Sequence, residues 1–357
     1  MHLHSKIAVL LLLCTLGHST SANGDEQVRH YRGMCDASAA AFLGDGHFVM
    51  ADDESNVLRI YSLEKGKDMP VGQLDLGKFL GAPGQKHPES DIEGCTQIGD
   101  TLYWITSHGR NKDGKWRPMR YRFFATQMVP AGEEGRFDLK PKGEAYSGLV
   151  SGLLDLKNPS LLPYIGVTGK KDKSGRLAPK KDGLNIESLC ASEDGKIIYI
   201  GFRNPRPGGK AMLLPLLNPA ELVAGGDDIP RPKFGKPIYF DFKGLGFRAM
   251  EYSPFHRDHI IVAGSHDGKG SSQLYRWNGE VDSPASRIRA LDSFNPETVL
   301  VNPASGRLHF FSDDGSVLYK VSPEQSLAEL ENGRCECKDL ADPKMKAFRM
   351  VELDLPK

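Results

Sequence analysis

The sequence predicts an all-β protein with the architecture of a β-propeller. A hairpin pattern occurs five times along the 357 residues. Each copy consists of two short runs of strand-forming residues joined by a tight turn. Each hairpin is followed by a third run of strand character and often by a fourth, and helical periodicity is absent from these windows. Self-similarity at a period above about forty residues, with three to four antiparallel strands per unit, is typical of propeller blades. Five blades are detected, and a sixth is left open.

The five hairpins carry polar residues at matching places. The clearest copy, 90–111, has an acid at the start of its first strand, a Gly-Asp turn, and a histidine at the end of its second strand. In four copies the two polar positions are 15 or 16 residues apart: Ser38 and Asp53, Glu93 and His108, Glu187 and Arg203, Glu251 and His266. The fifth copy runs from Asn295-Pro-Glu297 to Ser312-Asp313-Asp314.

The remaining strands complete the blades. Runs rich in β-branched and aromatic residues predict third strands at 57–61, 120–124, 211–214, 273–277 and 317–321. Fourth strands are predicted at 70–74, 136–140 and 237–240. The alternating run 348–355 is expected either as the outermost strand of the fifth blade or as the strand that closes the ring against the N-terminal segment.

A long step between the second and third copies contains 131–182, which is rich in Gly, Lys and Pro. A degenerate sixth blade is one interpretation of this segment. We favour an outer strand for the second blade plus a loop insertion, because loops tolerate added length at little cost. Residues 23–357 are accordingly predicted to form a single propeller domain.

The first 22 residues are predicted to be a secretory signal peptide. His2, His4 and Lys6 precede an apolar run at 7–16, and small residues follow it. About ten apolar residues are too few to span a bilayer, so no stable membrane insertion is expected after cleavage. The mature protein is predicted to be extracytoplasmic, either periplasmic or secreted. A formal net charge of zero argues against nucleic acid as a partner, because such domains carry a basic patch.

Five cysteines remain after signal cleavage, which is an odd number. Cys35, Cys95 and Cys190 lie on first strands and are interpreted as small buried apolar residues. Cys335 and Cys337 lie in a charged loop near the C-terminus. In an oxidising compartment, a disulfide that involves one of these two is one outcome and unpaired thiols are the other. A metal-binding pair is disfavoured, because no further Cys or His lies close by.

The first strand of each propeller blade lines the central channel, so the repeated acids are predicted to meet around one axis. The residues two positions earlier point the same way, because side chains alternate with period two. The predicted metal ligands are Asp91, Glu93, Asn185, Glu187, Glu251 and Glu297. Confined carboxylates must be protonated, paired or metal-bound, and oxygen donors favour Ca²⁺ or another divalent cation. The alternative is that each glutamate pairs with an arginine or a backbone group and joins neighbouring blades.

The second-strand positions are predicted to lie at the same mouth. His108 is the predicted acid or base, and Arg203 is the predicted clamp for a small anionic ligand. Further ligand-binding positions are expected at Asp36, Asp53, His266 and Asp313, with Asp314 as an alternative to the last. The pairs Ser107-His108 and Ser265-His266 are not interpreted as catalytic relays, because adjacent residues on a strand point to opposite faces.

Six segments resemble one bacterial family: C-D-A-S-A, A-D-D-E-S-N, S-D-I-E-G, Y-W-I-T-S-H-G-R-N, G-L-N-I-E-S and G-F-R-N-P-R-P. The family is domain of unknown function 3616, and the resemblance covers about Gly33 to Leu355. It implies an exported, propeller-like protein without an established activity. The Asp-x-Glu-Gly strand start is also similar to esterase-like phytase propellers and, more distantly, to six-bladed metal-dependent lactonases. That signature is complete at Glu93-Gly94, whereas Glu187 and Glu251 are followed by other residues.

Together these observations predict an exported propeller with a ligand site at the mouth of its channel. The predicted activity is metal-dependent hydrolysis of a phosphate ester or a lactone. The alternative is a non-catalytic propeller of the cell envelope that uses its face to bind a protein or a glycan.

Overall fold

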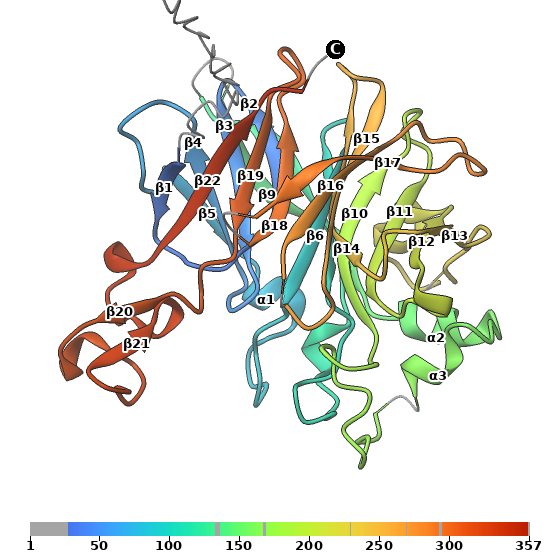
Figure 1. The fold of residues 1–357 in the computed structure, drawn as a ribbon, viewed down its shortest axis with the longest axis horizontal. Helices are drawn as coiled ribbons and strands as arrows, with labels where there is room; N and C mark the ends of the chain where they lie inside the picture. The colour runs from blue at the N-terminus through green and yellow to red at the C-terminus, as the bar shows by residue number, and fades with distance from the viewer. Residues whose placement is uncertain are drawn as a thin grey trace, which may run out of the picture.

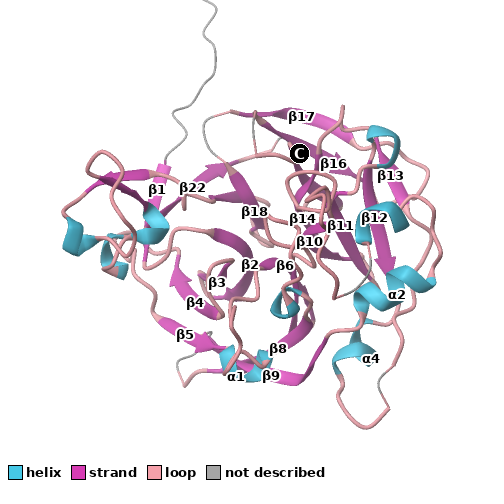
Figure 2. Cartoon of the chain, turned by 90° about the horizontal axis from the view of Figure 1, so that it is seen from below, coloured by secondary structure: helices cyan, strands magenta, loops and turns pink. Residues whose placement is uncertain are grey.

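The computed structural model describes residues 28–132, 136–166, 169–228, 230–268, 270–292 and 295–355, so the predicted signal peptide lies outside the described residues. Five four-stranded antiparallel sheets surround one axis, which confirms the five-bladed β-propeller (Figures 1 and 2). The described residues form no sixth blade. Among them, no helix is long and apolar enough to cross a membrane.

The first four blades each use four strands in chain order, from the channel outward. The first blade contains β2 (Ala37–Gly44), β3 (His47–Asp52), β4 (Val57–Ser62) and β5 (Gly72–Asp75). The second contains β6 (Ile92–Ile98), β7 (Thr101–Thr106), β8 (Phe123–Pro130) and β9 (Phe137–Tyr146). The third contains β10 (Asn185–Ala191), β11 (Ile198–Asn204), β12 (Ala211–Leu216) and β13 (Ile238–Phe240). The fourth contains β14 (Gly246–Ser253), β15 (Asp258–Gly264), β16 (Ser272–Trp277) and β17 (Ser286–Leu291).

The fifth blade joins the two ends of the chain. Its order is β18 (Pro296–Val301), β19 (Leu308–Ser312), β22 (Ala347–Leu353) and β1 (Val28–Arg32). The C-terminal run is therefore the third strand, and the N-terminal segment pairs with it as the outermost one. Because the first and last strands of the chain share one sheet, backbone hydrogen bonds close the ring.

The prediction of a third strand at 317–321 is wrong. That segment contains β20 (Leu318–Lys320), which pairs with β21 (Arg334–Glu336) in a small ribbon beside the five blades (Figure 1). Two of its three residues are exposed, whereas β22 buries alternate residues. The third position of the fifth blade is covered by a neighbouring blade and favours a strand with an apolar face. β22 has such a face and occupies this position.

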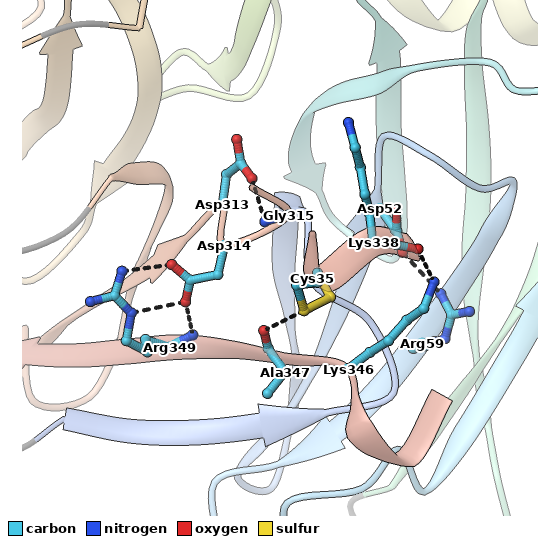
Figure 3. Close-up of a disulfide and its surroundings, with 11 residues drawn as sticks. Cys35, Asp52, Arg59, Asp313, Asp314, Gly315, Lys338, Lys346, Ala347 and Arg349 are labelled. Carbon is cyan, nitrogen blue, oxygen red and sulfur yellow. Dashed lines mark hydrogen bonds and ion pairs between the residues drawn. A yellow bond between two sulfur atoms is a disulfide. The ribbon is translucent and has the colours of Figure 1, made fainter. Parts of the chain in front are cut away.

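A disulfide ties this ribbon to the first blade. Cys35, just before β2, is bonded to Cys337, just after β21 (Figure 3). The pairing confirms the disulfide expected in the C-terminal loop and corrects the interpretation of Cys35 as a buried thiol. Cys95, Cys190 and Cys335 are buried free cysteines.

Short helices lie in the connections between strands. They are α1 (Gly77–Leu80), α2 (Leu149–Asp155), α3 (Leu162–Ile165) and α4 (Pro219–Val223). Segment 131–182 supplies all of β9 and then α2 and α3. Helix α2 buries Leu149, Val150 and Leu153 against the core between the second and third blades. Five apolar clusters, one between each pair of neighbouring blades, hold the ring together.

Every inner strand is irregular near its start, where one extra residue interrupts the pairing with the second strand. A β-bulge of this kind re-aims a side chain. The residues at the interruptions are Ser38, Glu93, Glu187, Arg248 and Glu297. Gly94 follows one of them because a Cβ there would lie 2.8 Å from the backbone nitrogen of Leu189 in the next blade. These five bulge residues form a ring of side chains around the channel.

Candidate functional site

A cavity of about 750 Å³ opens at the end of the channel where the inner strands begin. All five bulge residues line it. Nine of the residues predicted from sequence are brought together in its walls: Asp36, Asp53, Asp91, Glu93, Asn185, Glu187, Arg203, Glu297 and Asp313. The neighbouring Asp314 is instead buried in a structural ion pair with Arg349 of β22 (Figure 3).

One half of the ring is a closed network of arginines and glutamates. Arg248 lies between Glu187 and Glu297, with its Nε 3.3 Å from Oε2 of Glu187 and its Nη2 in contact with Oε1 of Glu297. Arg203 also pairs with Glu187. Arg248 and Glu187 are each only 2% exposed. Burial, followed by repulsion from Arg203, lowers the pKa of Arg248 to about 10, and at neutral pH it stays charged.

Two amides complete this network. Asn185 donates from Nδ2 to Oε1 of Glu187 at 2.7 Å, and Asn295 donates from Nδ2 to Oε1 of Glu297 at 3.2 Å. A buried charge is tolerated when it is both paired and hydrogen-bonded. Glu187 and Glu297 therefore pair with arginines of the protein. The sequence had left this pairing open as the alternative to metal binding.

The other half is acidic, and only some of its carboxylates have a cationic partner. Asp53, Asp91 and Glu93 each place one carboxylate oxygen within 4.8 Å of the others, as do Asp36, Asp52 and Asp53. Asp91 pairs with Arg120, whose Nη1 is 3.1 Å from Oδ2. Within the described ranges, Asp53 and Glu93 have no ion-pair partner. Three carboxylates at this spacing repel one another unless protons or a cation intervene.

The pKa values of these acids reflect that arrangement. Burial raises the pKa of Glu93 well above its usual range, and the charges of Asp91 and Glu187 raise it further. Burial also raises the pKa of Asp53, with additional repulsion from Glu93 and Asp36. The pKa of Asp36 rises to about 9 through burial and the nearby carboxyls of Asp313 and Asp52. In the absence of a cation, the acidic half retains protons at neutral pH.

Ser38 adds a neutral oxygen to the acidic half. It is 5% exposed and occupies the bulge position of the first blade. Its Oγ is buried and has no hydrogen-bond partner among the residues that the structure describes. An unsatisfied buried hydroxyl costs free energy unless a ligand or water supplies the partner.

His108 does not line this cavity. It is 1% exposed, adopts a positive φ of 52°, and lies among Arg110, Trp116 and Tyr121 beneath the insertion. Its Nδ1 is 2.8 Å from the carbonyl oxygen of Thr106, and burial lowers its pKa to about 4. His108 follows β7, which ends at Thr106, and its side chain is turned away from the acids. The preceding Ser107 instead hydrogen-bonds the side chain of Asp91. Burial raises the pKa of Asp91, and Arg120 and this hydrogen bond lower it to a smaller extent.

Two other predicted residues are also outside the mouth. His266 is half-buried but is absent from the cavity wall, where the neighbouring Asp267 and Gly268 lie instead. Glu251 faces the channel but lines its opposite end. The 15-residue spacing had identified Glu251 as the equivalent of Glu93 and Glu187 in the fourth blade. The register of β14 instead places Arg248 at the bulge, three positions earlier.

Arg248, Arg120 and Lys338 are site residues that the sequence reasoning missed. A signal for the first was present, because Gly-Leu-Asn-Ile-Glu187 aligns with Gly-Leu-Gly-Phe-Arg248. Arg120 lies in a short 3₁₀ turn and not in the predicted third strand, which begins at Phe123. Lys338 reaches the cavity from the ribbon anchored by the disulfide, with its Nζ 3.4 Å from Oε1 of Glu54.

Comparisons with known proteins address the family and not the chemistry. No curated protein matches the chain. The solved glutaminyl cyclase of Myxococcus xanthus is similar at a TM-score of 0.38 and 14% identity, over 91% of this chain and 96% of that one. The β-propeller domain of Swd1 from Myceliophteria thermophila is similar at a TM-score of 0.37 and 11% identity, over 92% of this chain and all of that one. Both scores are too low to assign a fold or an activity.

The family comparison is more extensive. Residues 36–120 and 153–306 match the family described as "Protein of unknown function (DUF3616)". These segments contain the inner strands of the first four blades and the start of the fifth. The chain belongs to the DUF3616 family.

Proposed function

We propose that the acidic half of the channel mouth binds a divalent cation of the calcium type through Asp53, Asp91 and Glu93. The observation that carries this proposal is the convergence of their three carboxylate oxygens within 4.8 Å. Hard cations prefer oxygen donors of this kind. The unpartnered hydroxyl of Ser38 in the same cavity wall supports it independently.

The same cavity suits a small anionic ligand beside the cation. Positively charged residues also line this cavity, among them Arg110, Lys112, Arg117, Arg120, Lys180, Lys181 and Arg203. Two of them, Lys180 and Lys181, come from the end of the insertion. A volume of about 750 Å³ accommodates a ligand larger than a bare ion. Arg203 is held in place by Glu187, so its guanidinium is preorganised for an anion.

We further propose hydrolysis of a phosphate ester or a lactone as the reaction. A divalent cation held by Asp53, Asp91 and Glu93 would supply Lewis-acid activation of water and of the bond to be cleaved. Because His108 faces away, Asp36 is the carboxyl best placed to exchange a proton, since its oxygen lies within 4.8 Å of those of Asp52 and Asp53. Arg203 and Arg120 would hold the anionic group of the substrate against the acidic half.

A non-catalytic binding propeller of the cell envelope is the second candidate. The observation that favours it is the ion network of Arg203, Arg248, Glu187 and Glu297, in which these charged side chains pair with one another and need no ligand. In that case the cation would order the mouth for a protein or a glycan.

Metal analysis and activity measurements test the proposal. Protein purified without chelator should contain about one equivalent of a divalent metal, and Glu93→Gln should lose it. A panel of phosphate esters and lactones should show turnover that disappears with the metal and with Glu93→Gln. Glu251→Gln, which removes a carboxylate at the other end of the channel, is the matched control and should keep both. A metal content and turnover that are unaffected by Glu93→Gln would rule out the proposed site, and metal without turnover would favour the binding propeller.

A further inference from the structure

A second cavity of about 750 Å³ lies at the opposite end of the channel, where the hairpin turns of the inner strands meet. Its walls are mainly small or apolar and include Ala40, Ala41, Ala191 and Val301. A narrow waist, lined by Ser38, Glu93, Glu187, Glu297 and Glu251, separates the two cavities. Glu251 is therefore the charged residue at the inner end of the second cavity.

The other charged groups of this cavity are already engaged or positive. Asp194 pairs with Lys196 at 3.0 Å, and Glu193 hydrogen-bonds the hydroxyl of Tyr252. Arg257 lies at the rim and is exposed. Glu251 itself has neither an ion pair nor a side-chain hydrogen bond among the described residues. Its carboxyl thus faces an open volume with nothing from the protein to balance its charge.

The chemistry of Glu251 selects the kind of ligand. A metal ion needs several oxygen donors, and the clusters of three candidate ligands in the described part of the chain lie at the mouth, not here. A single carboxylate beside alanine and valine walls instead suits an organic cation, whose one charge pairs with the carboxylate while its apolar part packs on the small side chains. An anion would be repelled by the same group.

We propose that this second cavity is a binding site for a primary amine, whose ammonium group pairs with the carboxylate of Glu251. The site is distinct from the channel mouth and does not depend on the function proposed there. It lies at the end of the channel opposite the mouth, where the hairpin turns of the inner strands meet.

The pH dependence of binding follows from the surroundings of Glu251. Burial raises its pKa to about 8, and the thiols of Cys95 and Cys190, which face it from neighbouring strands, have pKa values that burial raises well above the usual range. The thiols stay neutral, and the other charged side chains in the cavity wall are Glu193, Asp194 and Arg257. An ammonium ion requires the ionised carboxylate, so its affinity should rise up to about tenfold per pH unit between pH 6 and 8 and then level off.

Calorimetric titration with n-butylamine, and with n-butanol as the neutral analogue, tests the proposal on the purified protein at pH 8. Butylamine should bind at least about tenfold more tightly than butanol, which corresponds to about 1.4 kcal/mol. Glu251→Gln should lower the butylamine affinity by about tenfold or more and remove its pH dependence. Arg257→Gln should strengthen binding about twofold at low salt, because it removes the positive charge at the rim.

The controls separate this site from the mouth. Glu93→Gln should bind butylamine as the unmodified protein does, and Glu251→Gln should unfold at an equal or higher temperature at pH 8, which shows that it is folded. Equal binding of butylamine and butanol, or unchanged binding by Glu251→Gln, would overturn the proposal. Loss of binding in Glu93→Gln would also overturn it, because the amine would then occupy the mouth.

Discussion

Glu93 and Glu187 occupy equivalent bulge positions in neighbouring blades, yet their surroundings are opposite. Glu187 is held between Arg203 and Arg248, whereas Glu93 faces Asp53 and Asp91. The backbone of the repeat delivers a side chain to the ring in both cases. The difference shows that the fold supplies positions and that the identities of the neighbours decide whether a carboxylate is structural or available to a ligand.

The largest effect is expected in the arginine half. Arg248→Met should lower the free energy of unfolding by about 3–5 kcal/mol, because it leaves Glu187 and Glu297 buried without their shared cation. Urea unfolding measures the change. Arg231→Met is the matched control, since its pair with Asp155 is exposed and should contribute less than about 1 kcal/mol. If both variants lowered the free energy of unfolding by less than about 1 kcal/mol, the ion pairs of Arg248 would not be what stabilises this half.

The disulfide should matter next, and chiefly for the acidic half. It joins Cys35 and Cys337, 302 residues apart, and lies next to Asp36 and Lys338. Cys337→Ser should lower the free energy of unfolding by about 3 kcal/mol, because the unfolded chain gains freedom. Cys35→Ser should have the same effect, and dithiothreitol should then change neither variant. Unequal losses in the two variants would indicate that one serine disturbs the packing instead.

The two halves should also respond differently to pH. The raised pKa of Asp36, about 9, means that the folded state holds a proton which the unfolded chain releases near pH 4. Its contribution to stability is complete below pH 4 and is lost as the pH rises to about 9, at no more than about 1.4 kcal/mol per pH unit. Melting temperatures of chelator-treated protein should therefore fall between pH 5 and 9. Asp36→Asn should flatten this slope, and a slope that Asp36→Asn leaves unchanged would assign the titration to another group.

The smallest effect compares the two halves most directly. The same Glu→Gln substitution should change the free energy of unfolding in opposite directions in the two halves. In chelator-treated protein at pH 8, Glu93→Gln should raise the free energy of unfolding by about 1 kcal/mol, since burial and the acidic neighbours destabilise the ionisable carboxyl of Glu93 and not a neutral amide. Glu187→Gln should lower it by about 1–3 kcal/mol, because two guanidinium groups lose a charged partner. Calcium should stabilise the unmodified protein but not Glu93→Gln. Changes of the same sign would remove the distinction between the halves.

Much of the architecture was predictable because it depends on patterns among residues close together in the sequence. Period-two runs and tight turns identified the hairpins of all five blades, and the acids of the second and third were placed at the correct bulges. The fourth blade failed because counting residues cannot reveal a bulge or a change in turn length, and so Glu251 was taken for the equivalent of Arg248. His108 failed because it lies beyond the end of β7 with a positive φ, so strand alternation does not decide where its side chain points.

The sequence by itself determined that hairpins repeat, that their inner strands carry polar residues, and that the chain belongs with propellers, because strand alternation and turn chemistry act between residues close in the chain. Only the tertiary structure decided which residues become neighbours across blades: Arg248 with Glu187 and Glu297, Asp53 with Asp91 and Glu93, and Cys35 with Cys337. These contacts join segments far apart in sequence, and they depend on how the five blades are arranged around one axis. Electrostatic energy depends on such distances, so the division of the mouth into a compensated and an uncompensated half is a property of the closed ring.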